Sequence, residues 1–110
     1  MKESAVPILV IMVTVGNQKE ARRIGKRMVD AKLAACANII PAIESIYRWK
    51  GKVVKSQEVL LIFKSTKVRY AALEKAIKAI HPYDTPEIIS LPVNKGLAQY
   101  IEWVCCETTY

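Results

Sequence analysis

One histidine and three cysteines are the residues best suited to chemistry in this chain of 110 residues. His81 directly precedes Pro82 at the predicted end of a helix, where the helix dipole favours a protonated imidazole. It suits three roles: a hydrogen bond to a helix carbonyl, a single ligand in an open metal site, or a proton donor in a cleft. Cys36 stands in a run of small residues, which is typical of a buried, inert thiol. A catalytic pair of Cys36 and His81 would require the two side chains to meet in space.

The cysteines form no recognisable framework. Their number is odd, Cys105 and Cys106 are adjacent, and no Cys-x-x-Cys motif is present. Adjacent cysteines have poor geometry for a mutual disulfide, and a single histidine argues against a closed zinc site. The pattern indicates a reducing compartment and, since nothing resembles a targeting segment, we expect a cytoplasmic protein.

Two charges interrupt an otherwise apolar predicted strand. Glu58 and Lys64 are six positions apart, so the two-residue period of a strand puts them on the same face. Charges in such a strand must be paired or exposed, which predicts either pairing across strands or subunits, or contact with a ligand in an intersubunit cleft. The larger aromatic residues are expected to serve as core or interface anchors: Tyr47, Trp49, Tyr83, Tyr100 and Trp103.

The formal charge of +7 invites a nucleic-acid interpretation, but the basic residues are scattered apart from one group. That group falls on the polar face of the first predicted helix, as either a solvated face or an anion-attracting surface: Lys19, Arg22, Arg23, Lys26 and Arg27. The run Val59–Phe63 is fully apolar, which argues against an RNA-recognition sheet. No phosphate-binding glycine loop and no Gly-x-Ser-x-Gly motif is present, so the sequence names no reaction.

The elements that position these residues centre on a long hairpin. Two strands, Asn38–Trp49 and Val53–Ser65, are predicted around a tight turn at Lys50-Gly51. At roughly twelve residues each they span about 40 Å, whereas the two longer predicted helices span about 22 Å. The helices can therefore cover only about half of the hairpin, and the other half would expose aromatic side chains and unpaired strand edges to water. The length mismatch predicts an oligomer of identical chains.

The remaining elements complete one domain over residues 1–110. The apolar run Val6–Val15 predicts a central strand, and Asn17 begins a helix that extends to about Leu33. Ser65 or Thr66 can cap a second helix, which ends at His81-Pro82, and a last strand covers Glu87–Val93. A short final helix follows, with four residues expected to point inward: Leu97, Tyr100, Ile101 and Val104. The order β-α-β-β-α-β plus a helix predicts a ferredoxin-like α+β sandwich with both long helices on one face. No apolar run is long enough to span a membrane.

Four ordered motifs resemble the CutA family of divalent-cation tolerance proteins. They cover nearly the whole chain: Leu33-Ala-Ala-Cys-Ala-Asn-Ile-Ile-Pro41, Ser45-Ile-Tyr-Arg-Trp-Lys-Gly-Lys52, His81-Pro-Tyr-Asp-Thr-Pro-Glu-Ile88, and Leu91-Pro-Val93 with Gly96, Tyr100 and Trp103.

The resemblance implies a non-enzymatic, ferredoxin-like homotrimer that assembles through its long hairpins and edge strands and is linked to tolerance of copper or another divalent cation. It carries His81 over as the metal candidate and suggests an intersubunit cleft formed by Tyr47, Trp49, Glu58, Lys64, Tyr83 and Glu87. Copper binding is proposed for members with a cysteine near the end of the first strand, and the equivalent stretch here, Met12–Val15, contains none. Alternatives are a PII-like regulator of an unknown partner protein and a cysteine–histidine enzyme. We expect neither a membrane nor a nucleic-acid partner.

Overall fold

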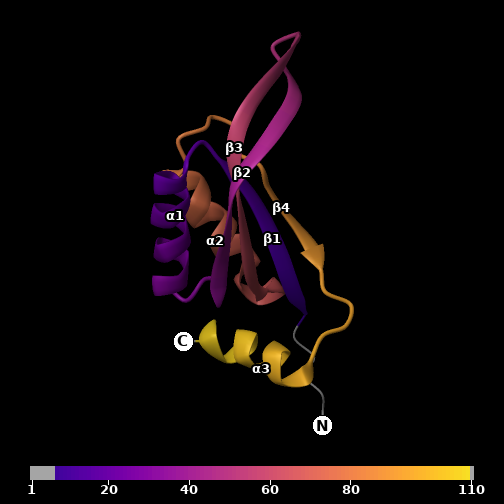
Figure 1. The fold of residues 1–110 in the computed structure, drawn as a ribbon. Helices are drawn as coiled ribbons and strands as arrows, with labels where there is room; N and C mark the ends of the chain where they lie inside the picture. The colour runs from indigo at the N-terminus through magenta and orange to yellow at the C-terminus, as the bar shows by residue number, and fades with distance from the viewer. Residues whose placement is uncertain (1–6, 110) are drawn as a thin grey trace.

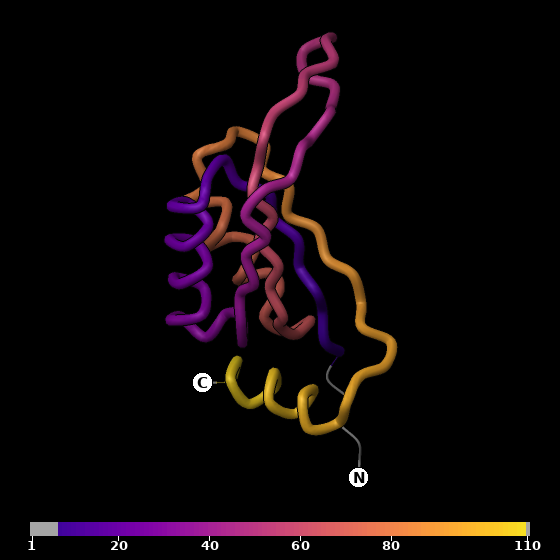
Figure 2. Tube along the Cα trace, in the orientation of Figure 1, coloured from indigo at the N-terminus to yellow at the C-terminus, as the bar shows by residue number. Residues whose placement is uncertain are grey.

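A long β-hairpin is the dominant element of the structure, a computed structural model that describes residues 7–109 (Figure 1). Its strands are β2 (Cys36–Trp49) and β3 (Lys52–Thr66), and they are antiparallel with a register shift between Ile40 and Ile43. Lys50 and Gly51 join them with φ angles of 51° and 81°, the positive values that a tight two-residue hairpin loop requires. The far end of the hairpin extends beyond both long helices (Figure 2), as the sequence predicts.

The hairpin is part of a four-stranded antiparallel sheet in the order β2-β3-β1-β4. The central strand β1 (Ile8–Val15) is apolar and lies between β3 and β4, and the predicted Val6 lies outside the described residues. The edge strand β4 (Ile88–Pro92) is shorter than predicted by one residue at each end, although Val93 N still donates to Ile8 O at 3.0 Å.

The first helix, α1 (Gln18–Asp30), begins where the sequence predicts and ends earlier. Asn17 Oδ1 accepts a hydrogen bond from Glu20 N at 2.9 Å, which caps the first turn. The expectation that the helix reaches Leu33 is wrong, because Lys32 adopts a left-handed backbone with φ of 61° and the Leu33 N–H turns back to Met28 O. Leu33 is nevertheless buried in the core, as expected from its place in the apolar stripe.

The second helix, α2 (Lys67–Ile80), lies beside α1 on the same face of the sheet (Figure 1). Thr66 Oγ1 caps it by accepting from Arg69 N at 3.3 Å, and Leu73 and Ile77 are fully buried. The helix ends at His81, whose extended backbone leads into Pro82. Both long helices therefore shelter only the lower part of the sheet.

The third helix, α3 (Ala98–Glu107), lies across the end of the sheet opposite the hairpin tip (Figure 1). Val104 is buried against Ile8 and Ala35, with Ile101 packed beside it. The expectation that Leu97 and Tyr100 point inward is wrong: their side chains are 69% and 40% exposed. Because α3 crosses only the end of the sheet, only a narrow stripe of its surface, around Val104, is buried.

The face of the sheet opposite α1 and α2 remains apolar and uncovered within one chain. Register and alternation place Ile40, Ile62, Ile89 and Leu91 on this face. Ile89 and Leu91 are 50% and 54% exposed, which is a large exposure for adjacent aliphatic side chains of one strand.

Candidate functional site

A pocket of about 530 Å³ lies between the hairpin and the loop that connects α2 to β4. The hairpin and the end of β1 form one wall, and the loop forms the other: Thr14, Ser45, Ile46, Tyr47, Trp49, Glu58, Tyr83, Asp84, Thr85 and Glu87. The structure thus brings together most of the predicted cleft residues, namely Tyr47, Trp49, Glu58, Tyr83 and Glu87.

One hydrogen bond joins the two walls of the pocket. The Tyr83 hydroxyl donates to Glu58 Oε2 at 2.7 Å, and Glu58 is only 9% exposed. Burial, and next the hydrogen bond to the Glu58 carboxylate, raise the pKa of Tyr83 well above its ordinary value. The phenol therefore remains a neutral donor that orients the carboxylate at physiological pH.

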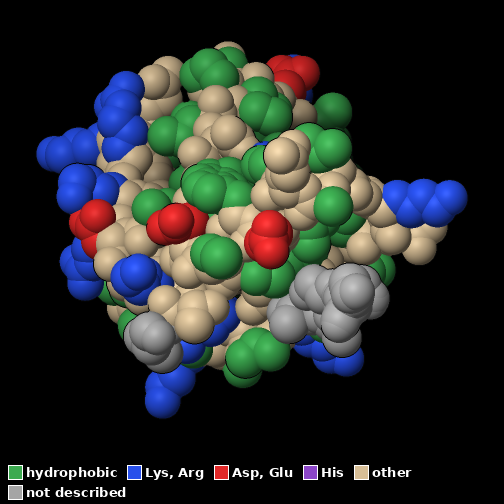
Figure 3. Space-filling model, turned by 90° about the horizontal axis from the view of Figure 1, so that it is seen from below, with side chains coloured by type: hydrophobic (Ala, Val, Ile, Leu, Met, Phe, Trp, Pro, Cys, Tyr) green, Lys and Arg blue, Asp and Glu red, His purple; other side chains and the backbone are tan. Residues whose placement is uncertain are grey.

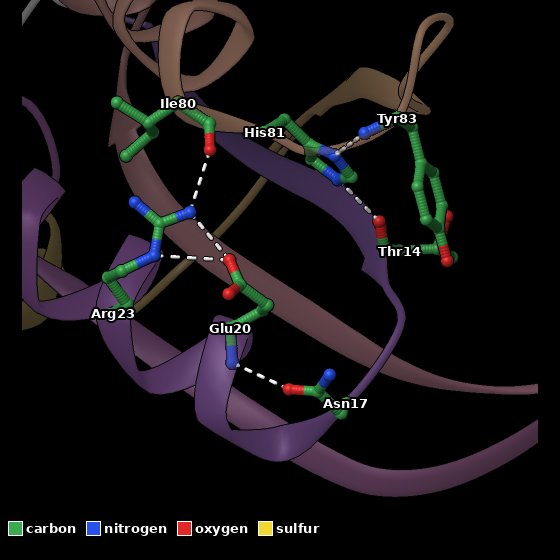
Figure 4. Close-up of polar contacts among 7 residues, drawn as sticks. All are labelled: Thr14, Asn17, Glu20, Arg23, Ile80, His81 and Tyr83. Carbon is green, nitrogen blue, oxygen red and sulfur yellow. Dashed lines mark hydrogen bonds and ion pairs between the residues drawn. The ribbon is translucent and has the colours of Figure 1, made fainter.

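His81 contacts two residues that line the pocket, Thr14 and Tyr83 (Figure 4). Its Nδ1 accepts from Tyr83 N at 3.1 Å, so the proton is assigned to Nε2, which donates to Thr14 O at 2.8 Å. The ring also packs against the Tyr83 ring with centroids 4.7 Å apart. Both ring nitrogens form hydrogen bonds, and the residue is only 7% exposed. In this structure His81 therefore positions the loop.

Arg23 and Glu20 hold the start of the same loop from α1 (Figure 4). Arg23 Nη2 donates to Ile80 O at 2.7 Å and to Glu20 Oε1 at 2.5 Å. Sequence analysis placed Arg23 on the polar face of the helix, and no local pattern shows that its side chain would reach across to α2. The contact attaches the end of α2, and with it His81, to α1.

Lys64 lies away from the pocket, although it shares a strand with Glu58. The Lys64 ammonium donates to Asn38 Oδ1 on β2, and the register places Lys64 opposite Val10. Six residues of extended strand separate it from Glu58, about 20 Å at the usual rise. The two charges therefore form neither an ion pair nor a shared site within the chain.

Cys36 and His81 do not meet. In the register of β2 and β3, Cys36 lies opposite Lys64, near one end of the sheet. Its Sγ lies 3.7 Å from the Tyr100 hydroxyl. His81 contacts Thr14 at the other end of β1. The proposed cysteine–histidine pair is therefore absent from the structure.

The basic side chains of α1 do not line the pocket. Lys19, Arg22, Lys26 and Arg27 are exposed, and Figure 3 shows Lys and Arg side chains concentrated along the α1 side. Lys26 pairs with Asp30 at 2.6 Å. Their exposure agrees with both interpretations of this face, a solvated face and an anion-attracting surface.

Five lining residues were not predicted: Thr14, Ser45, Ile46, Asp84 and Thr85. Asp84 and Thr85 stand inside the His81–Ile88 motif, so their proximity to Tyr83 and Glu87 was a usable signal. Ser45 and Ile46 likewise stand in the Ser45–Lys52 motif with Tyr47 and Trp49. Thr14 carries no local signal, because its place in the pocket depends on how the end of β1 meets the hairpin and the loop. Among residues 7–109, no group of three or more His, Cys, Asp or Glu side chains is arranged to hold a metal ion.

The strand order, with both long helices on one face, defines a ferredoxin-like α+β protein with an extended hairpin. Residues 9–107 match the family described as CutA1 divalent ion tolerance protein. The chain belongs to the CutA1 divalent ion tolerance family.

Individual relatives support this assignment. The divalent-cation tolerance protein CutA of Thermus thermophilus is 45% identical over 95 residues, which cover 86% of this chain and 92% of the relative. The chloroplastic protein CutA 1 of rice is 45% identical over 101 residues, and the match spans 92% of this chain but only 57% of that longer protein.

Solved structures agree with the fold. Rice CutA1 superimposes with a TM-score of 0.92 at 44% identity, covering 94% of this chain and 95% of the other. The Thermus thermophilus protein superimposes with a TM-score of 0.91 at 43% identity, covering 93% of this chain and 99% of the other. No helix in the described part of the chain is long and apolar enough to cross a membrane.

Proposed function

We propose that this chain is a non-catalytic homotrimer that acts in divalent-cation tolerance and binds a small ligand in clefts between its subunits. The observation that carries the proposal is the uncovered hairpin: Ile46, Trp49 and Val53 are 67%, 46% and 65% exposed. Such a ribbon is an aggregation hazard unless another chain covers it. The names of the relatives supply the link to divalent cations.

The uncovered sheet face supports the same assembly. Ile89 and Leu91, on the edge strand β4, continue an apolar surface that begins on β3 and β1. Identical chains present the same hairpin and the same face, so a closed ring of copies can bury both at once.

The pocket supports the location of the ligand site. Four of its lining residues belong to the part of β2 that leaves the body: Ser45, Ile46, Tyr47 and Trp49. A neighbouring chain that covers this part of the hairpin would also cover the pocket mouth. The site would then lie in a cleft between two subunits.

Matched substitutions of two highly exposed valines test the assembly. Val53 on the hairpin is 65% exposed and Val68 on α2 is 76% exposed. We expect Val53→Asp to weaken the oligomer in sedimentation velocity, because it places a charge in the buried interface, whereas Val68→Asp leaves the mass unchanged. Equal masses for both variants and wild type would remove the hairpin from the interface.

A divalent cation is the ligand that the family name suggests, and His81 is the predicted metal residue. A metal ion at either ring nitrogen would have to displace the hydrogen bond to Tyr83 N or to Thr14 O. Titration of Cu(II) into wild type and His81→Ala tests this role, with circular dichroism to verify folding. Weaker Cu(II) binding by the variant would support this role. Equal affinity of both proteins would show that His81 is not part of the site, and no binding by either protein would contradict the proposal of a metal ligand.

A further inference from the structure

We propose that the pocket between the hairpin and the α2–β4 loop binds a small organic ammonium cation. The inference rests on the proposed function, because it names the ligand of the proposed cleft. It is argued from the charge, the wall and the size of the pocket.

The charges of the pocket are all of one sign. Its lining contains Glu58, Asp84 and Glu87 and no lysine, arginine or histidine. Glu58 is more than nine-tenths buried and its carboxylate has a neutral phenol as its hydrogen-bond partner, with no ion pair to any of residues 7–109. A buried carboxylate is normally matched by a cation, and here the ligand would supply it.

The remaining walls are aromatic. Tyr47, Trp49 and Tyr83 line the same pocket as Glu58, and the faces of such rings attract cations. Trp49 already has one cation nearby, because Lys50 Nζ lies 5.9 Å from its ring centroid. Aromatic faces combined with carboxylates favour a cation with an apolar surface, since a bare divalent ion instead requires oxygen ligands at about 2.0–2.6 Å.

The size of the pocket leads to the same class of ligand. About 530 Å³ is within the range of roughly 300–1,000 Å³ that holds organic ligands, and it is far larger than a metal ion needs. The three carboxylates also do not converge into a group that could hold a metal among the described residues. Charge alone would permit a metal ion, but volume and geometry favour an organic cation.

Choline is the probe, and 3,3-dimethylbutan-1-ol is its matched control because it has the same shape without the charge. The chain has two tryptophans, so a Trp103→Phe background leaves Trp49 as the only indole reporter. We expect choline to change Trp49 fluorescence saturably, with a dissociation constant in about the millimolar range or tighter. The neutral alcohol should bind at least about tenfold more weakly, because it lacks the charge that the carboxylates and rings attract.

Two variants locate the interaction. Glu58→Gln keeps the shape and the hydrogen bond to Tyr83 but removes the charge, and we expect about tenfold weaker choline binding. Glu44→Gln removes a hairpin carboxylate that lies outside the pocket and near Lys55, and choline binding should be unchanged.

The mass of the same sample separates this inference from the proposed function. A trimer that does not bind choline, or binds the alcohol equally well, overturns the inference alone. A trimer that excludes choline and dissociates in Glu58→Gln shows instead that a partner's basic hairpin fills the pocket, and also overturns it. A monomer overturns the proposed function, whatever choline does.

Discussion

Tyr83 connects three parts of the molecule through a single residue. Its hydroxyl donates to Glu58 on β3, its backbone N–H donates to His81, and its ring packs on the imidazole. Because His81 in turn donates to Thr14 O, the loop that forms one wall of the pocket is attached to β1 as well as to the hairpin. The position of Glu58 in the pocket therefore depends on neutral Tyr83.

The Tyr83 hydroxyl should stabilise the protein only while it is protonated. Its pKa is raised in the folded chain above the ordinary value of 10, so the stabilisation is complete below about pH 10 and is lost as the pH rises toward the folded-state pKa. We expect wild type to exceed Tyr83→Phe by about 1 kcal/mol in free energy of unfolding at pH 8. Urea unfolding of both proteins between pH 8 and 11 should show this difference shrinking above pH 10. A difference that stays constant or grows would contradict the assignment.

At the scale of elements, the contact between α1 and the end of α2 positions the pocket loop. Arg23 reaches from α1 to Ile80 O, the last carbonyl before His81. Arg22 is its natural comparison, because it is the adjacent arginine and bonds only to Gln18 within its own helix.

Arg23→Ala should therefore destabilise the protein by about 1 kcal/mol, which is below the usual range for charged hydrogen bonds because the side chain is partly exposed. Arg22→Ala should change the free energy of unfolding by less than about 0.5 kcal/mol. Thermal or urea unfolding measures both values. Equal effects of the two substitutions would show that the contact with Ile80 O adds no stability.

The sequence predicts elements better than it predicts contacts. Alternation, capping residues and Gly51 are local signals, and they correctly indicated the hairpin, both long helices and the ferredoxin-like order. The contact of Arg23 with Ile80 and the separation of Glu58 from Lys64 depend on tertiary geometry, which has no local signal. The apolar stripe of α3 was misjudged for the same reason, because its partner is the end of the sheet and not a sheet face.

At the scale of the whole molecule, the hairpin gives the chain an elongated shape of 52 × 25 × 22 Å. The helices cover the lower part of the sheet (Figures 1 and 2). Exposed apolar side chains are found on the hairpin, as at Ile46 and Val53, and on the opposite sheet face, as at Ile89 and Leu91. One chain therefore leaves uncovered the two surfaces that a packed assembly would bury. The pocket extends along the part of the hairpin that leaves the body, so assembly and ligand binding are expected to be coupled.

That coupling predicts an effect of the ligand on the oligomer. If choline binds in a cleft between subunits, saturating choline should lower the dissociation of the oligomer on dilution, because a ligand stabilises the state that binds it. Sedimentation velocity across a dilution series, with and without choline, measures the shift. An unchanged dissociation curve at saturation would place the site within one subunit.

The mass of the wild-type chain in dilute solution is the most direct test of the account. Sedimentation equilibrium should give three times the chain mass of 12.4 kDa, since copies must cover the hairpin and the open sheet face. A folded species of 12.4 kDa that persists as concentration increases would contradict the assembly.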